Sequence, residues 1–244
     1  MDFAFLHGGD QGSWIWEGVV AALKQQSSPD AHRFHLLDVP GCGTKRGRDT
    51  ADIAFPDIAA ELIADIRAAG LRDIIVVGHS QAGTVLPDLL ALEPALFRRA
   101  IYVSCSIPNP GQNVLQMVFA MHDGQDTPVA RSFRNAAVPR SEQQRHMFCN
   151  DMTADESDAF LALLGQDSWP PSSYAWTDWH HADRPAVPAS FVVCLQDTIL
   201  PPDWQYRFAE RFGADRTPRI DAGHQAMTTR PHALAEILLH EAKG

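Results

Sequence analysis

Short apolar runs recur along the chain and predict strands that are buried on both faces. Each run lacks the alternation with polar residues that a half-exposed strand would show, which is typical of a parallel sheet covered by helices on both sides. The predicted strands are Phe3–Leu6, Phe34–Leu37, Ile74–Val77, Ile101–Val103 and Phe191–Leu195, with a sixth and weaker one near Arg216–Ile220.

Helical patterns separate these apolar runs. Ile58, Leu62 and Ile66 recur every four residues, with Pro56 near the start and Gly70 just past the end of the predicted helix. Further helices are predicted at Gln81–Leu92, around Trp204–Phe212 and around Leu234–Glu241. This alternation predicts an α/β fold with a doubly wound, mainly parallel six-stranded sheet.

The stretch from 106 to 187 breaks the alternation, because it contains no convincing buried strand. Helices are predicted near Val114–His122, Glu142–Asn150 and Asp155–Leu164. We interpret 106–187 as an inserted, mostly helical cap, and 1–105 with 188–244 as the α/β core of one structural domain.

The charge balance and the cysteines narrow the class of protein. Lys plus Arg number 20 against 30 Asp plus Glu, a net charge of −10, so nucleic acid and anionic membranes are not expected partners. No apolar run approaches the roughly 18 residues of a membrane span, and Met1–Leu6 lacks the basic start of a secretory signal. Cys42, Cys105, Cys149 and Cys194 form no C-x-x-C pair, so we expect reduced thiols and a cytoplasmic protein.

The strongest local motif is Gly78–Gly83, which reads Gly-His-Ser-Gln-Ala-Gly and fits the pattern G-x-S-x-G. Because it follows a predicted strand and precedes a predicted helix, it predicts a nucleophile elbow with Ser80 on a sharp turn. The alternative is a tight structural turn with an idle serine. Pro87 falls inside the predicted helix and is expected to kink it.

A serine nucleophile needs a base and an orienting acid, which follow it along the chain in this kind of site. His224 comes directly after the last predicted strand, and Gly223 lets the loop bend back over the sheet. Asp197 follows the predicted strand Phe191–Leu195, at the carboxyl edge of the sheet where α/β active sites assemble. From there it would fix the tautomer of the His224 imidazole. Asp203 is the rival acid, but we expect it to cap the next helix.

The remaining histidines suggest no further chemistry. We expect His7 to support the first loop and His79 to point away from the site. His180 and His181 adjoin each other without a third ligand at helical spacing, so no metal site is predicted.

Acyl transfer also requires two N–H donors for the developing oxyanion. One is the backbone N–H of Gln81, directly after the nucleophile. The loop that follows the first strand offers the other at Gly9, where the missing side chain lets the backbone approach a substrate. The alternative for Gly9 is a plain glycine turn.

These blocks, taken in order, make the sequence resemble the α/β-hydrolase superfamily. Within it the chain resembles the branch of plant methylesterases and hydroxynitrile lyases, with bacterial esterase relatives. The narrower resemblance is carried by His7–Gly9 with Gly12–Trp16, by Phe191–Asp197 and by Gly223–Met227. It implies a six-stranded parallel sheet under a helical cap, no cofactor, and the same nucleophile, acid, base and oxyanion donors. The cap does not match recognisably, so substrate identity does not carry over.

Two positions depart from the lyases of that branch. Those enzymes carry Thr after the histidine of the first loop and Lys after the catalytic histidine, where this chain has Gly8 and Gln225. The cation that handles cyanide is therefore missing, which disfavours lyase activity.

The residues favour a cofactor-independent serine hydrolase that cleaves a carboxylic ester or lactone of a small, apolar or aromatic molecule through an acyl-enzyme. A lyase on the same triad and a ligand-binding receptor with vestigial turnover remain alternatives, and the oligomeric state stays open, a homodimer being one option. Six cap side chains are expected either to line the substrate pocket or to pack the cap onto the sheet: Met117, Phe119, Met121, Trp169, Trp176 and Trp179.

Overall fold

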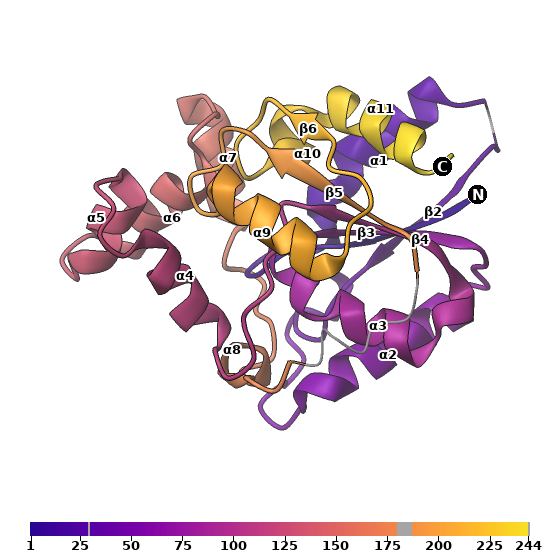
Figure 1. Ribbon diagram of the computed structural model, residues 1–244, viewed down its shortest axis with the longest axis horizontal. Helices are drawn as coiled ribbons and strands as arrows, with labels where there is room; N and C mark the ends of the chain where they lie inside the picture. The colour runs from indigo at the N-terminus through magenta and orange to yellow at the C-terminus, as the bar shows by residue number, and fades with distance from the viewer. Residues whose placement is uncertain (29, 180–186, 244) are drawn as a thin grey trace.

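The computed structural model describes residues 1–28, 30–179 and 187–243, and its strands form one six-stranded, all-parallel sheet (Figure 1). The strand order β2-β1-β3-β4-β5-β6 places the first strand inside the sheet, with later strands added on both sides of it. The predicted fold class is confirmed. The strands are β1 (Asp2–Leu6), β2 (Arg33–Leu37), β3 (Ile74–His79), β4 (Phe97–Val103), β5 (Ala189–Cys194) and β6 (Arg219–Ile220).

Burial explains why the apolar runs predicted these strands. Every residue of β1, β3 and β5 is buried, so neither face of these strands can carry polar side chains without partners. The strand β4 begins at Phe97 rather than at Ile101, because two arginines interrupt its apolar pattern. Arg98 is exposed, whereas Arg99 is buried and donates to Ser190 Oγ at 2.9 Å.

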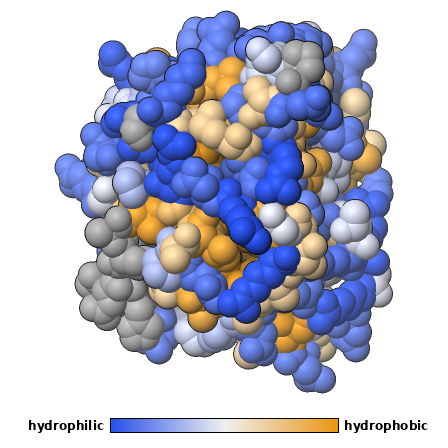
Figure 2. All heavy atoms as spheres, turned by 90° about the vertical axis from the view of Figure 1, so that its right-hand side faces the viewer, coloured by the Kyte–Doolittle hydropathy of each residue, from blue (hydrophilic) through white to orange (hydrophobic). Residues whose placement is uncertain are grey.

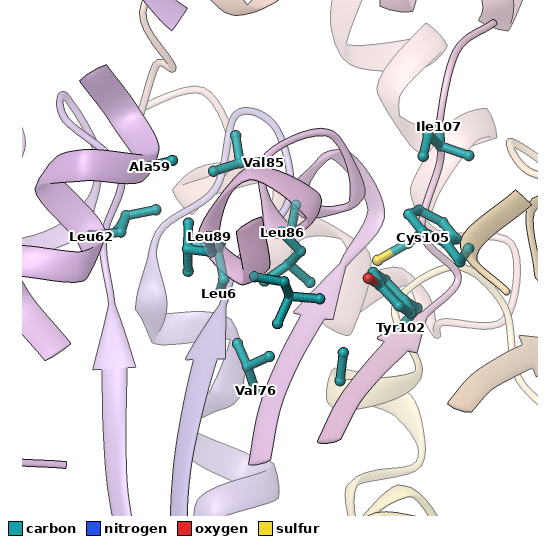
Figure 3. Close-up of a cluster of buried hydrophobic side chains, with 14 of the residues drawn as sticks. Leu6, Ala59, Leu62, Val76, Val85, Leu86, Leu89, Tyr102, Cys105 and Ile107 are labelled. Atoms are coloured by element: carbon teal, nitrogen blue, oxygen red, sulfur yellow. The ribbon is translucent and has the colours of Figure 1, made fainter. Parts of the chain in front are cut away.

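Helices cover both faces of the sheet, and each face has its own apolar cluster. Figure 3 shows one cluster, in which Leu6 and Val76 of the sheet pack against Leu62, Leu86 and Leu89. On that face lie α2 (Phe55–Ala68), α3 (Leu86–Leu92) and α9 (Pro202–Phe212). On the other face lie α1 (Glu17–Gln26), α10 (Ala226–Thr229) and α11 (Pro231–Glu241).

The helix predicted at Gln81–Leu92 is divided into a 3-10 turn at Ser80–Thr84 and the helix α3. Pro87 consequently lies in the first turn of α3, where its missing N–H would have no intrahelical partner in any case. The expected kink inside a helix is therefore wrong. Further 3-10 turns lie at Ser13–Trp16, Gly43–Lys45 and Pro94–Leu96.

Between β4 and β5 the described part of the chain forms helices and no strand (Figure 1). The helices are α4 (Val114–His122), α5 (Pro128–Arg134), α6 (Arg140–Phe148), α7 (Ala154–Leu163) and α8 (Ser172–Ala175). Of these, α4, α6 and α7 correspond to predicted helices, whereas α5 and α8 had no recognisable pattern. We call the described residues 106–179 the helical segment below.

Figure 2 views the side on which the termini lie, where hydrophilic residues cover most of the face and apolar ones appear between them. Within the described ranges, no helix combines the length and the apolar character needed to cross a bilayer. All four cysteines are free and buried, and burial raises the pKa of each thiol.

Candidate active site

Ser80 lies on the turn that follows β3, with a φ of 52° in the left-handed region. A non-glycine residue there carries strain of order 1–3 kcal/mol, which persists only where the surroundings fix the turn. Gly83 lets the turn pack closely against the backbone at Ser106, because a Cβ at position 83 would lie 2.5 Å from the carbonyl oxygen of Ser106. The N–H of Ser106 in turn donates to the Ser80 carbonyl at 3.0 Å.

His224 follows β6 and reaches Ser80 from the neighbouring loop. Its Nε2 lies 3.0 Å from Ser80 Oγ, and the residue is 1% exposed. Asp151, which lies between α6 and α7, holds this loop by accepting from the Gly223 N–H at 2.7 Å and from Thr229 Oγ1 at 2.8 Å. Sequence reasoning missed Asp151, since a lone aspartate in a connection gives no pattern.

Asp197 follows β5 and completes the arrangement. Its Oδ2 lies 2.6 Å from His224 Nδ1, and its Oδ1 accepts from the N–H groups of Ile199 at 3.0 Å and Leu200 at 2.8 Å. The second partner of Oδ2 is the Ser104 hydroxyl, which donates at 2.6 Å from the end of β4. These bonds fix the carboxylate, so it can hold the imidazole with Nε2 directed at Ser80.

Sequence reasoning also missed Ser104. A hydroxyl at the carboxyl end of the strand beside β5 is the signal that could have identified it as a partner of Asp197.

Ser80 opens into a cavity of about 190 Å³ between the sheet and the helical segment. Gly9 and Gln81, the expected oxyanion donors, both lie in its wall next to Ser80. A Cβ at Gly9 would lie 2.2 Å from Gln81 Oε1, so the Gln81 side chain packs directly against the glycine of the first loop and would have to move for a larger residue. The apolar part of the wall comes from Val114, Leu115, Val118, Phe119, Phe133, Met147, Phe148, Ile199 and Leu200.

Comparison with known proteins places this arrangement in a family. A model described as the alpha/beta hydrolase family matches residues 3–237. The protein belongs to the alpha/beta hydrolase family.

Relatives of this hydrolase lie in the methylesterase branch that the sequence resembles. It is 22% identical to polyneuridine aldehyde esterase of Rauvolfia serpentina, covering 97% of this chain and 94% of that protein. It is 21% identical to a chloroplastic protein of Arabidopsis thaliana named as methylesterase 11, covering 99% of this chain but only 64% of that protein. An extracellular alpha/beta-hydrolase from a Paenibacillus species has the same fold, with a TM-score of 0.77, 19% identity and coverage of 99% and 98%.

The rival acid of this hydrolase, Asp203, lies away from the histidine. It falls in the first turn of α9 with an exposed side chain, and it makes an ion pair with Arg207 at 3.9 Å. The residue before the helix is Pro201, and no side chain caps it. The expectation that Asp203 caps the helix is therefore wrong.

His79 differs from its expectation, because its ring turns towards His224 rather than away. The ring centroids are 4.6 Å apart, and His79 Nε2–H donates to the His224 carbonyl at 3.0 Å. Burial, and next the charge of His224, lowers the pKa of His79 well below its usual value, so His79 stays neutral and supports the loop. His7 has the structural role expected, since its Nε2 accepts from the Val39 N–H at 3.2 Å.

Of the six residues expected to line the pocket or pack the cap, Phe119 lies in the cavity wall. The other five are outside it and pack the helical segment onto the core. Trp169 is buried and donates from Nε1 to the Gly8 carbonyl at 3.0 Å, while Trp176 and Trp179 contact the ring of Phe55. Met117 and Met121 are buried in the apolar cluster shown in part in Figure 3.

Among residues 1–28, 30–179 and 187–243, no group of three or more His, Cys, Asp or Glu side chains could hold a metal ion. His180 and His181 lie outside the described residues.

Proposed function

We propose that this esterase-type alpha/beta hydrolase cleaves carboxylic esters or lactones of small, apolar or aromatic molecules through an acyl-enzyme on Ser80. The observation that carries the proposal is the continuous chain of contacts from Ser80 Oγ through His224 to Asp197, which opens on an apolar cavity. Its relatives named methylesterase and polyneuridine aldehyde esterase support an ester as the substrate.

The reaction follows from these contacts in two halves. Ser80 Oγ attacks the ester carbonyl carbon while His224 Nε2 takes its proton, and Asp197 stabilises the imidazolium. The negative charge on the carbonyl oxygen meets the N–H groups of Gly9 and Gln81. As the tetrahedral intermediate collapses, the C–O bond to the alkoxide breaks and His224 returns the proton to it. Water then repeats the sequence on the acyl-enzyme and releases the acid and Ser80.

Two features of the structure, at Gly8 and at Gln225, disfavour a lyase on the same residues. A Cβ at Gly8 would lie 2.9 Å from Ser80 Cβ, so this loop has no room for the threonine of the related lyases. Gln225 is fully buried, is absent from the cavity wall and carries no charge. A departing cyanide would therefore lack the ammonium whose attraction at 4 Å is worth about 4 kcal/mol at an effective dielectric of 20.

The direct test measures both reactions on one preparation. Wild-type protein should hydrolyse a short-chain nitrophenyl ester with a burst of nitrophenol, and should release no cyanide above background from mandelonitrile at pH 5–6. Ser80→Ala should fold normally and lose up to about 10⁶-fold in kcat. If Ser80→Ala kept a tenth of the wild-type activity, the assignment of Ser80 as the nucleophile would be refuted. Cyanide release that disappears in Ser80→Ala would establish the lyase instead, and pocket binding with no burst would establish a receptor.

We also propose a cytoplasmic location. The four cysteines are unpaired and buried, as suits a compartment in which thiols stay reduced. Fractionation of the source cells should recover the esterase activity with cytosolic markers, and recovery outside the cytoplasm would refute this location.

A further inference from the structure

Gln11 is a polar residue of the cavity wall, and its side-chain amide oxygen has no hydrogen-bond donor among the described residues. It is 1% exposed and lines the same cavity as Ser80. Its Oε1 is buried, and no described group donates a hydrogen bond to it. Buried polar atoms without partners are uncommon because each one costs folding free energy, so each calls for an explanation.

The position of Gly8 shows how close this amide lies to the reacting serine. A Cβ built on Gly8 would lie 2.9 Å from Ser80 Cβ and 3.1 Å from Gln11 Oε1, so these two atoms are within about 6 Å of each other. An acyl group on Ser80 can therefore bring a hydroxyl on its second or third carbon, two or three bonds from the carbonyl carbon, into hydrogen-bond range of Gln11.

The surroundings of Gln11 favour a neutral substituent over an ionised one. The described residues of the wall include no Lys or Arg. The neighbouring carboxylate, Asp10, already accepts from Tyr174 Oη at 3.2 Å and from Arg140 at 3.0 Å, and a second carboxylate beside it would be repelled. An amide oxygen without a donor calls for an O–H group on the substrate.

We infer that Gln11 forms a polar subsite that selects esters of 2- or 3-hydroxy carboxylic acids, with the hydroxyl donating to the Gln11 amide oxygen and the apolar remainder against the aromatic wall. The inference rests on the proposed function, since it names the acyl group that the same cavity accepts. It makes Gln11 a specificity residue rather than a participant in bond breaking.

Gln225 provides a matched control within the chain. Both of its side-chain amide atoms are buried without a described partner, as Oε1 of Gln11 is, but Gln225 is absent from the cavity wall. Gln11→Met and Gln225→Met each remove such an amide at similar side-chain volume. Both variants should raise the melting temperature, and only Gln11→Met should change substrate preference.

The experiment compares kcat/KM for each enantiomer of methyl mandelate with that for methyl phenylacetate, which lacks only the hydroxyl. In the wild type, kcat/KM should be higher for one enantiomer of methyl mandelate than for methyl phenylacetate. Gln11→Met should reduce this ratio about tenfold, as expected for the loss of one hydrogen bond. Gln225→Met should keep the wild-type preference. Comparing the same two esters on each variant cancels their difference in intrinsic reactivity.

The outcomes separate this inference from the proposed function. If nitrophenyl acetate is hydrolysed but wild type shows no preference that Gln11→Met removes, the inference alone is overturned. The same holds if Gln11→Met slows both methyl esters equally or lowers the melting temperature, because the amide would then be structural. If no ester is hydrolysed, nitrophenyl acetate included, the proposed function fails and the subsite fails with it.

Discussion

The α/β core and the helical segment use their side chains in opposite ways. In the core, whole strands such as β1 and β3 are buried, and the side chains of the proposed triad lie in the loops that follow the strands. In the helical segment, α6 has no buried residue and α4 carries the half-exposed Phe119 in the cavity wall. The core thus holds the contacts from Ser80 through His224 to Asp197, and the helical segment supplies part of the cavity wall, so we expect substitutions in the two regions to affect different measurements.

After Ser80→Ala, the largest effect is expected in the core, at the proposed acid. Asp197→Asn should keep the fold and lower kcat by about 10⁴-fold, because the amide favours the wrong His224 tautomer. Asp203→Asn, on the exposed side of α9, should change kcat little. Ester hydrolysis by the two purified variants provides the measurement, and equal losses or the reverse order would mean that the acid is misassigned.

The helical segment should respond to mutation mainly through stability. Trp169→Ala should lower the free energy of unfolding by about 3–5 kcal/mol, since it empties a fully buried site between the segment and the core. Phe119→Ala, at a side chain that is 54% exposed, should change it by less than about 0.5 kcal/mol and instead raise KM. Denaturant unfolding measures the free energy of unfolding of the two variants, and ester kinetics measures their KM. An unchanged free energy of unfolding in Trp169→Ala would show that the helical segment does not depend on the packing of Trp169.

Sequence reasoning was accurate where burial on both faces leaves only apolar residues, as in β1, β3 and β5, and where a motif carries its own geometry, as at Ser80. It missed α1, although Val19, Ala22 and Leu23 share one buried face. It could not separate Phe119 from Trp169, because lining a cavity and packing against Phe55 or Gly8 require the same apolar side chains.

A smaller effect in the core would show how far the acid depends on its neighbour. Ser104→Ala removes the hydroxyl that donates to Asp197 Oδ2, and a hydrogen bond to a charged group is worth about 1.5–3 kcal/mol. We expect kcat/KM to fall about 10- to 100-fold. Ser132→Ala serves as the control, because this buried hydroxyl bonds the Val129 carbonyl in α5 and should leave kcat/KM unchanged. Identical losses in both variants would remove Ser104 from the site.

The smallest expected effect is a dependence of stability on pH that both regions share. Burial lowers the pKa of His7 and His79 in the core and of His122 in α4, relative to an unfolded value of 6.5. As the pH falls below 6.5 the unfolded chain takes up protons first, so stability decreases there and is unaffected above it. Each histidine can cost up to about 1.4 kcal/mol at one pH unit below 6.5.

Denaturant titrations between pH 7.5 and 5.5 measure how steeply the free energy of unfolding depends on pH. His122→Gln keeps a donor for the Ile199 carbonyl and removes one titrating histidine, so it should make this pH dependence less steep by the contribution of His122. An unchanged slope in this variant would show that the helical segment contributes nothing to the pH response.

The burial of all four thiols has a consequence for labelling experiments. Maleimide and similar reagents attack the thiolate, and a buried thiol with a raised pKa rarely presents one. Cysteines introduced as Leu92→Cys at the end of α3 and Leu163→Cys at the end of α7 would occupy positions where the native side chains are 53% and 41% exposed. A fluorophore pair on those two sites would report the separation of the two regions during turnover, with no native cysteine removed beforehand.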